Sequence, residues 1–153
     1  MPRRGSLRAF LRDERGAIAI MGAAFAICGV GALAIGVDVA SVFVERRKAQ
    51  SAVDLAAIAA ARDPDKALQA ATATINDNGV FGVRDIRITK GSYTANPAIP
   101  AALRFVANGT PANAVMVELD SRARAYLGAG FRRGGTMDVT PRATAVSTAQ
   151  AAF

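Results

Sequence analysis

The longest uniform pattern in the chain is an apolar run close to its start. Residues 16–37 contain no charged side chain, Asp38 interrupts the run, and apolar residues then continue as far as Val44. A helix over residues 16–37 is about 33 Å long, which is enough to cross the roughly 30 Å hydrocarbon core of a bilayer. The pattern therefore predicts a transmembrane helix over residues 16–44, with Asp38 near its outer edge, where a carboxylate can reach headgroups or water.

Basic residues on either side of this run indicate its orientation. Five arginines precede it within residues 1–15, and Arg46, Arg47 and Lys48 follow it directly. Because lysine and arginine beside a span favour the cytoplasmic side, residues 1–15 are predicted to be a basic cytoplasmic flank. The remainder of the chain then lies on the other side of the membrane, and membrane lipids are its neighbours.

A cleavable signal peptide is the alternative interpretation of the same run. Ala32-Leu33-Ala34 resembles an A-x-A cleavage site, and cleavage there would give a secreted or surface-exposed small protein. However, Ile35-Gly36-Val37 continues the run, which is longer than the usual apolar core of roughly 7–15 residues in a signal peptide. We expect the segment to be retained as an anchor.

Small residues recur along the predicted span at every fourth position. A stripe of this kind lets a second helix approach closely, so that packing drives association within lipid. The same spacing also arises by chance in a chain rich in alanine and glycine. The stripe predicts a helix-packing face, and it would support a homo-oligomer or contact with another membrane helix; its members are Ala24, Cys28, Ala32, Gly36 and Ala40.

Beyond the span, residues 45–79 are predicted to form an Ala-rich helical stalk and a second helix. Residues 45–62 contain neither Gly nor Pro, and Val42, Ala49, Val53, Ala56 and Ala60 fall on one helical stripe, which we expect to pack against a second element. Asp63-Pro64 then caps and opens the second helix, whose buried side is predicted to carry Leu68, Ala71, Thr72 and Ile75. Asn78-Gly79 ends it.

The pattern changes to strand periodicity in residues 80–153. Apolar and polar positions alternate over residues 86–89 and most clearly over residues 115–120, while residues 137–146 form a last strand with Pro141 at an edge or bulge. This predicts a small antiparallel sheet of three or four strands, which is too small to bury a core alone and is expected to pack on the second helix. The predicted fold class is α+β: a long N-terminal transmembrane helix that continues into a stalk, a second short helix and a small antiparallel sheet.

Composition argues against catalysis. The chain has no histidine and one cysteine, which removes imidazole bases, His-based metal sites and an intramolecular disulfide. No nucleophile–base pair or phosphate-binding glycine motif is present, so we predict no enzyme activity, no cofactor and no metal. The net charge of +7 is spread along the chain instead of being concentrated on one arm with aromatic residues, so nucleic acid is not expected as a partner.

A set of residues in the first 62 positions carries a resemblance to a known family. Gly16 opens the span after Arg12-Asp13-Glu14-Arg15, Asp38 stands at its exit, Arg46-Arg47 and Gln50 follow, and Asp54 lies inside the Ala-rich helix. This order and spacing resemble the N-terminal segment of TadG-like Flp/Tad pilus assembly proteins. From the residues alone, Asp54 is either a solvated helix residue or the partner of Arg47 or Lys48 in a neighbouring chain.

The resemblance implies a protein of the bacterial inner membrane with a periplasmic domain that helps to build or anchor an adhesive pilus. Its partners would be other pilus-assembly or pseudopilin proteins. Longer TadG proteins carry a von Willebrand A-like domain with a metal site, and we expect this chain to be a short form without one. TadE-type pseudopilins have a glutamate five residues after the processing glycine, where this chain has Met21.

Overall fold

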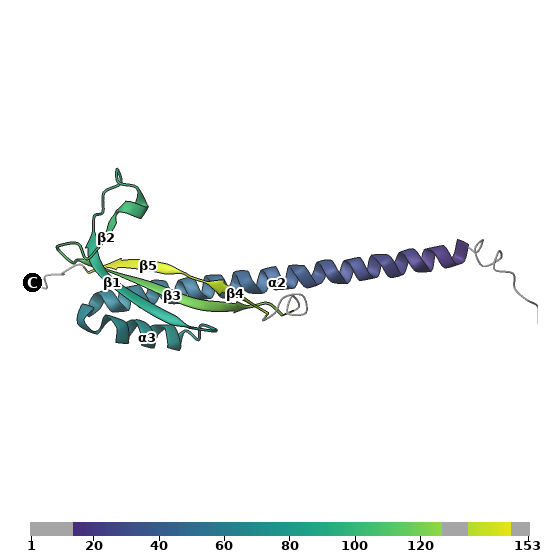
Figure 1. Ribbon diagram of the computed structural model, residues 1–153, viewed down its shortest axis with the longest axis horizontal. Helices are drawn as coiled ribbons and strands as arrows, with labels where there is room; N and C mark the ends of the chain where they lie inside the picture. The colour runs from purple at the N-terminus through teal and green to yellow at the C-terminus, as the bar shows by residue number, and fades with distance from the viewer. Residues whose placement is uncertain (1–13, 127–134, 148–153) are drawn as a thin grey trace, which may run out of the picture.

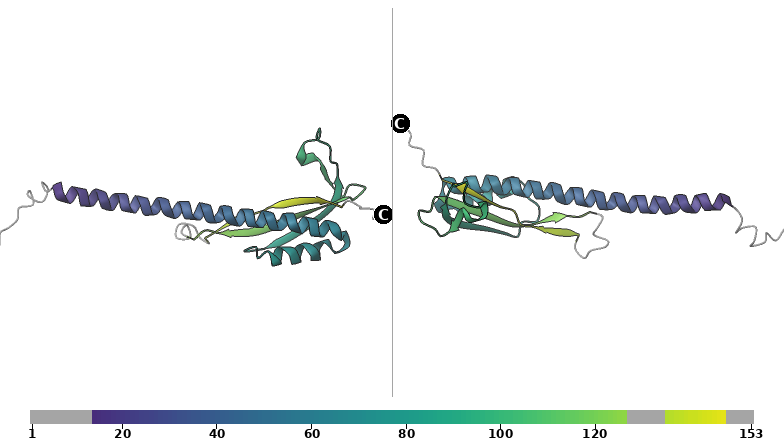
Figure 2. Two further views of the ribbon diagram at one scale, coloured as in Figure 1. Left: turned by 180° about the vertical axis from the view of Figure 1, so that it is seen from behind. Right: turned by 90° about the horizontal axis from the view of Figure 1, so that it is seen from above.

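The computed structural model describes residues 14–126 and 135–147, and it has an α+β fold, as predicted. A long helix, α2, runs out of a small module formed by the other elements, which cover one end of it (Figures 1 and 2). In chain order the elements are α2 (Glu14–Arg62), η1 (Pro64–Lys66), α3 (Ala67–Asp77), β1 (Asp85–Tyr93), η2 (Ala101–Leu103), β2 (Phe105–Ala107), β3 (Ala114–Arg124), β4 (Thr136–Val139) and β5 (Arg142–Val146).

Helix α2 is 49 residues long and joins the predicted span and stalk without a break. Its first half is bare, and large apolar side chains such as Ile18, Phe25 and Leu33 are more than two-thirds exposed. Among the described residues, α2 is the one helix long and apolar enough to cross a membrane, and none of its most apolar 18-residue stretch is buried in the protein. The predicted flank lies mostly outside the described residues, because these begin at Glu14.

The predicted start of the second helix is a short 3-10 turn, η1, and α3 itself begins at Ala67 and buries a slightly different face. The carboxylate of Asp63 accepts a hydrogen bond from the backbone N–H of Lys66, and Pro64 occupies the first turn. Ala67, Ala71 and Ile75 are buried at four-residue spacing, which is one stripe of a helix. The prediction that Leu68 lies on this face is wrong: it is 56% exposed, since one residue of offset turns a side chain about 100° around the axis.

The sheet is antiparallel, with strand order β2-β1-β3 and with β4 and β5 both on the far side of β3. Strands β4 and β5 share one register against β3, from Arg124↔Thr136 to Ala114↔Val146. The single last strand predicted over residues 137–146 is therefore present, but interrupted at Pro141. Proline has no N–H to donate, although its carbonyl still accepts a hydrogen bond from the Leu119 N–H at 3.0 Å.

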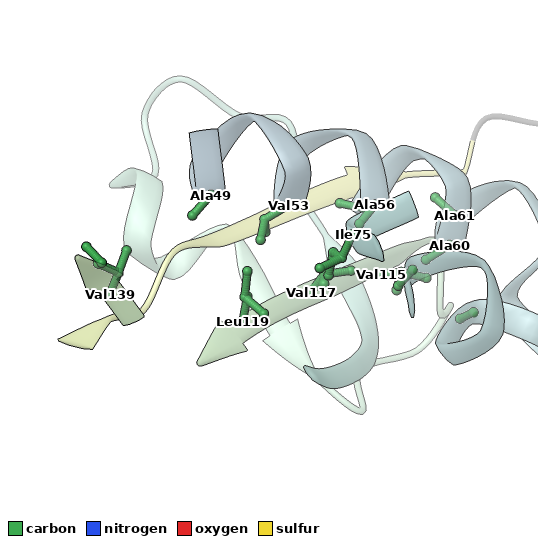
Figure 3. Close-up of a cluster of buried hydrophobic side chains, with 14 residues drawn as sticks. Ala49, Val53, Ala56, Ala60, Ala61, Ile75, Val115, Val117, Leu119 and Val139 are labelled. Carbon is green, nitrogen blue, oxygen red and sulfur yellow. The ribbon is translucent and has the colours of Figure 1, made fainter. Parts of the chain in front are cut away.

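The core lies between the inner face of the sheet and the second half of α2 (Figure 3). Strand β3 contributes Val115, Val117 and Leu119, which pack over a stripe of α2 that is almost entirely alanine and valine. The stripe consists of Ala49, Val53, Ala56, Ala57, Ala60 and Ala61. The predicted stalk stripe is thus confirmed as a packing surface.

The expectation that the sheet packs mainly on the second helix is wrong. Helix α3 instead packs against α2 and touches the sheet chiefly at β1, while α2 itself contacts β3 and β5 (Figures 1 and 3). Alanine side chains are short, so the alanine-rich face of α2 lets both the sheet and α3 approach its backbone. The stalk is consequently the central element of the module.

Candidate membrane-exit site and helix-packing face

The ends of β3 and β4 meet α2 where the predicted span ends. The Asp38 carboxylate, which is half-buried, accepts a hydrogen bond from the backbone N–H of Tyr126 at 2.7 Å. One turn further along α2, the Ser41 hydroxyl lies 3.1 Å from the carbonyl oxygen of Arg124 and can donate to it. These two contacts tie the end of β3 to the predicted exit point of the helix, and the first gives the half-buried Asp38 carboxylate a polar partner.

A groove of about 400 Å³ lies between α2 and the ends of β3 and β4. We call it the exit groove. Ala125, Thr136 and Met137 line its module side, and its α2 side is formed by Ile35, Asp38, Val39, Val42, Phe43 and Arg46. The groove is apolar along most of its length and has a guanidinium at the end furthest from the span.

A second polar contact joins the stalk to the last strand. The side-chain amide of Gln50 donates to the Asp54 carboxylate at 2.8 Å, four residues along the helix, and also to the carbonyl oxygen of Arg142 on β5 at 3.1 Å. Asp54 is exposed, and its partner within the chain is this glutamine. Asp54 therefore orients the residue that holds the edge of β5 against α2.

The outer face of the sheet carries a charged network at the same end as the exit groove. The Arg84 guanidinium bonds to the Asp120 carboxylate and lies 2.9 Å from that of Asp138, which Arg122 also approaches at 3.8 Å. The hydrogen bond to Asp120 is the main reason that the pKa of Arg84 is raised above its ordinary value. The side chains are one-third or more exposed except that of Asp120, so the network is a solvated one.

The five small residues predicted to form a helix-packing face are all exposed, Cys28 among them. Two residues along a helix correspond to about 200° of rotation, so Gly36 and Ala40 both lie on the face opposite Asp38. Since Asp38 faces the module, Gly36 and Ala40 point away from the module, and their side of α2 is exposed.

The structure separates the residues of the family motif. Gly16 is exposed near the start of α2, Asp38 and Arg46 lie at the exit groove, and Arg47 is exposed outside it. Asp54 belongs to the Gln50 contact instead. Ser41 and Tyr126 were missed by sequence reasoning, because their roles depend on contacts between segments more than 80 positions apart. Among residues 14–126 and 135–147, no group of three or more Cys, His, Asp or Glu side chains is placed to hold a metal ion.

Comparison with known proteins gives two family matches. A family model described as putative Flp pilus-assembly TadE/G-like matches residues 16–63, which cover the predicted span and most of the stalk. A second, described as putative Tad-like Flp pilus-assembly, matches residues 49–149, more than half of the chain and nearly all of the module. No curated protein and no solved structure gives a significant match.

Proposed function

Because this chain belongs to the family of Tad-like Flp pilus-assembly proteins, and is TadG-like in its first segment, we propose that it is a non-enzymatic, membrane-anchored subunit of Flp pilus assembly. One observation carries the proposal: α2 is divided into a bare apolar half and a half that is the core of a folded module. A bare apolar helix of this length is stable only in lipid or against other helices.

We place residues 16–44 in the bacterial inner membrane, with residues 1–15 in the cytoplasm. The stalk and second helix, residues 45–79, and the β-rich module, residues 80–153, then lie in the periplasm. The excess of arginine before the span supports this orientation. The Asp38–Tyr126 hydrogen bond lies near the end of this membrane segment, so the ends of β3 and β4 would reach into the periplasmic leaflet and the rest of the module would lie beyond it.

The open small-residue face supports packing against other helices. Gly36 and Ala40 are exposed on the side of α2 opposite the module, at the membrane exit. A neighbouring pilus-assembly or pseudopilin subunit, or a second copy of this chain, can bring its helix against that face without meeting the sheet. Membership of the family suggests that the partner is a pilus-assembly protein, and the small-residue stripe of α2 is the surface against which its helix would pack.

Deletion of the gene tests the proposal directly. We expect the deletion strain to lose surface Flp pili and adhesion, and expression of the full chain from a plasmid to restore both. In the same strain the chain should remain in the membrane pellet after alkaline carbonate extraction, as an integral protein does. Unchanged piliation would contradict the assembly role, and release of the chain by carbonate would contradict the anchor.

A further inference from the structure

The exit groove has apolar walls at one end and a cation at the other. Ile35 and Val39 lie on α2 at the end nearest the bare half of the helix, and Arg46 lies at the opposite end, about 16 Å further along the axis. Between them Val42 and Phe43 continue the apolar wall, and Met137 faces them from β4. The Asp38 carboxylate also lines the groove near its inner end, where it accepts the hydrogen bond of the Tyr126 N–H. Along the groove, the apolar walls therefore carry one hydrogen-bonded carboxylate first and the positive charge of Arg46 last.

This order matches the depth of the groove in a bilayer. The apolar stretch from Gly16 to Val44 is about 42 Å long as a helix, close to the roughly 40–45 Å of a bilayer with its headgroups. The inner end of the groove then lies at the level of the upper acyl chains, and Arg46 lies at the level of the phosphates. This placement rests on the membrane anchoring proposed above.

We propose that the exit groove binds a phospholipid of the periplasmic leaflet, with its phosphate on Arg46 and its upper acyl chain between α2 and β4. The described residues give the Arg46 guanidinium no carboxylate partner, so its charge is available to a phosphate. An apolar groove of about 400 Å³ is within the size range of small-molecule sites. At this depth lipid is the surrounding solvent, so it is the first molecule to reach the groove.

The bound lipid would hold the module upright on the membrane. Asp38 and Ser41 already fix the end of β3 to α2, and a lipid between α2 and Met137 would fill the apolar space beside these contacts. The site would therefore couple the angle of the module to the membrane surface as well as bind lipid.

Photo-crosslinking on the full-length chain tests this. The chain carries benzoylphenylalanine in place of Met137 and is reconstituted in vesicles of phosphatidylglycerol and phosphatidylethanolamine in equal parts. We expect a phospholipid adduct by mass spectrometry, which Arg46→Gln lowers by about fivefold, the effect of losing a partly exposed charge pair. Arg47→Gln, one residue away and outside the groove, is the matched control and should leave the yield unchanged. Val39→Trp, which fills the groove, should lower it without removing a charge.

A second labelled position separates the groove from the bilayer in general. Benzoylphenylalanine in place of Val37, outside the groove, should also give lipid adducts, but with a yield that does not depend on Arg46. An adduct at Met137 that is insensitive to both Arg46→Gln and Val39→Trp would overturn the lipid site, as would a protein adduct at that position when the same chain is irradiated in cell membranes. Carbonate extraction of each variant reports membrane insertion separately, so failure of the anchor is distinguished from failure of the groove.

Discussion

The carboxylate of Asp38 and the backbone N–H of Tyr126 are joined by a 2.7 Å hydrogen bond across 88 positions of the chain. Asp38 ends the uncharged part of the apolar run, and Tyr126 follows the last residues of β3. The bond therefore connects the anchor directly to the far end of the longest strand. Together with the Ser41–Arg124 contact, it fixes the end of β3 against α2 through a residue that the sequence predicted only to mark the end of the span.

Removing that acceptor should loosen the end of β3. We expect Asp38→Ala to lower the free energy of unfolding of the module by about 1 kcal/mol and to speed hydrogen exchange at the Tyr126 amide. Asp38→Asn keeps an acceptor oxygen at the same position and is the control, with a smaller effect on both quantities. Hydrogen–deuterium exchange of the full chain in micelles measures this, and equal exchange in Asp38→Ala and the parent protein would contradict it.

The close approach of α3 to α2 depends on alanine. Ala71 of α3 is fully buried in the core that α3 shares with α2, whereas Ala73, two residues along α3, is exposed. Leucine at position 71 overfills a packed contact, so Ala71→Leu should destabilise the module by about 1–3 kcal/mol. Ala73→Leu adds the same atoms to the same helix at an exposed site and should change the stability by less than about 0.5 kcal/mol. Urea unfolding followed by circular dichroism measures the stability of both variants. A loss of stability in Ala71→Leu as small as that in Ala73→Leu would show that the contact at Ala71 is loosely packed.

Much of the fold could be predicted because its signals are local. The stalk stripe from Ala49 to Ala60 and the alternation from Val115 to Leu119 each identify an element and its buried face within a dozen residues. Strand β3 continues past that alternation to Arg124, and its inward positions there include Ser121, which is buried. This buried serine interrupts the apolar alternation by which a strand is recognised in a sequence. In the structure, the Ser121 hydroxyl donates a hydrogen bond to the Val139 carbonyl oxygen, which allows a polar side chain at a buried position.

The partner of the sheet could not be predicted in the same way. Both α2 and α3 offer a small-residue face, and nothing local to either helix says which one meets β3 and β5. The contacts of Asp38 and Gln50 could not be predicted from the sequence either, because their partners, Tyr126 and Arg142, lie about 90 positions away. The sequence places both residues on the long helix, but their partners depend on how the later strands return to it.

The Arg84 network should respond to salt and hardly at all to pH in the neutral range. Its raised pKa means that the charged guanidinium is favoured in the folded state, so its contribution is present at and below neutral pH and is lost only above the ordinary arginine range. We therefore expect Arg84→Gln to lower the Tm slightly by the same amount at pH 6 and pH 9, and the difference to shrink at high salt. Thermal unfolding of the parent protein and of Arg84→Gln at low and high salt measures this difference in Tm. A difference in Tm that grows with salt would contradict an electrostatic origin.

The helix-packing face can be probed with the cysteine that the chain already has. Cys28 is exposed on the predicted stripe, so oxidation in native membranes should form a disulfide-linked dimer if two copies pack through this face. Gly36→Leu, which blocks close approach, should lower the dimer yield by about fivefold, and Val37→Leu should not. Moving the thiol by one position, with Cys28→Ala and Ile27→Cys together, turns it about 100° around the helix and should also lower the yield. Equal yields from positions 27 and 28 would argue for random collision and against a specific face.

The N-terminus of the mature protein decides between anchor and cleaved signal. Helix α2 passes through Ala34 without a break, and its core residues and its hydrogen bond to Tyr126 all follow that position, so cleavage after Ala34 would leave the core of the module with no span. We expect intact-mass spectrometry of the protein extracted from membranes to show that the arginine-rich flank is retained. The variant Ala34→Leu, which removes the small residue that a signal peptidase requires at that position, should change neither the mass nor the membrane fraction. A chain that starts at Ile35 in the parent protein and is longer in Ala34→Leu would establish secretion, and would remove the bare half of α2 on which the packing face and the exit groove both depend.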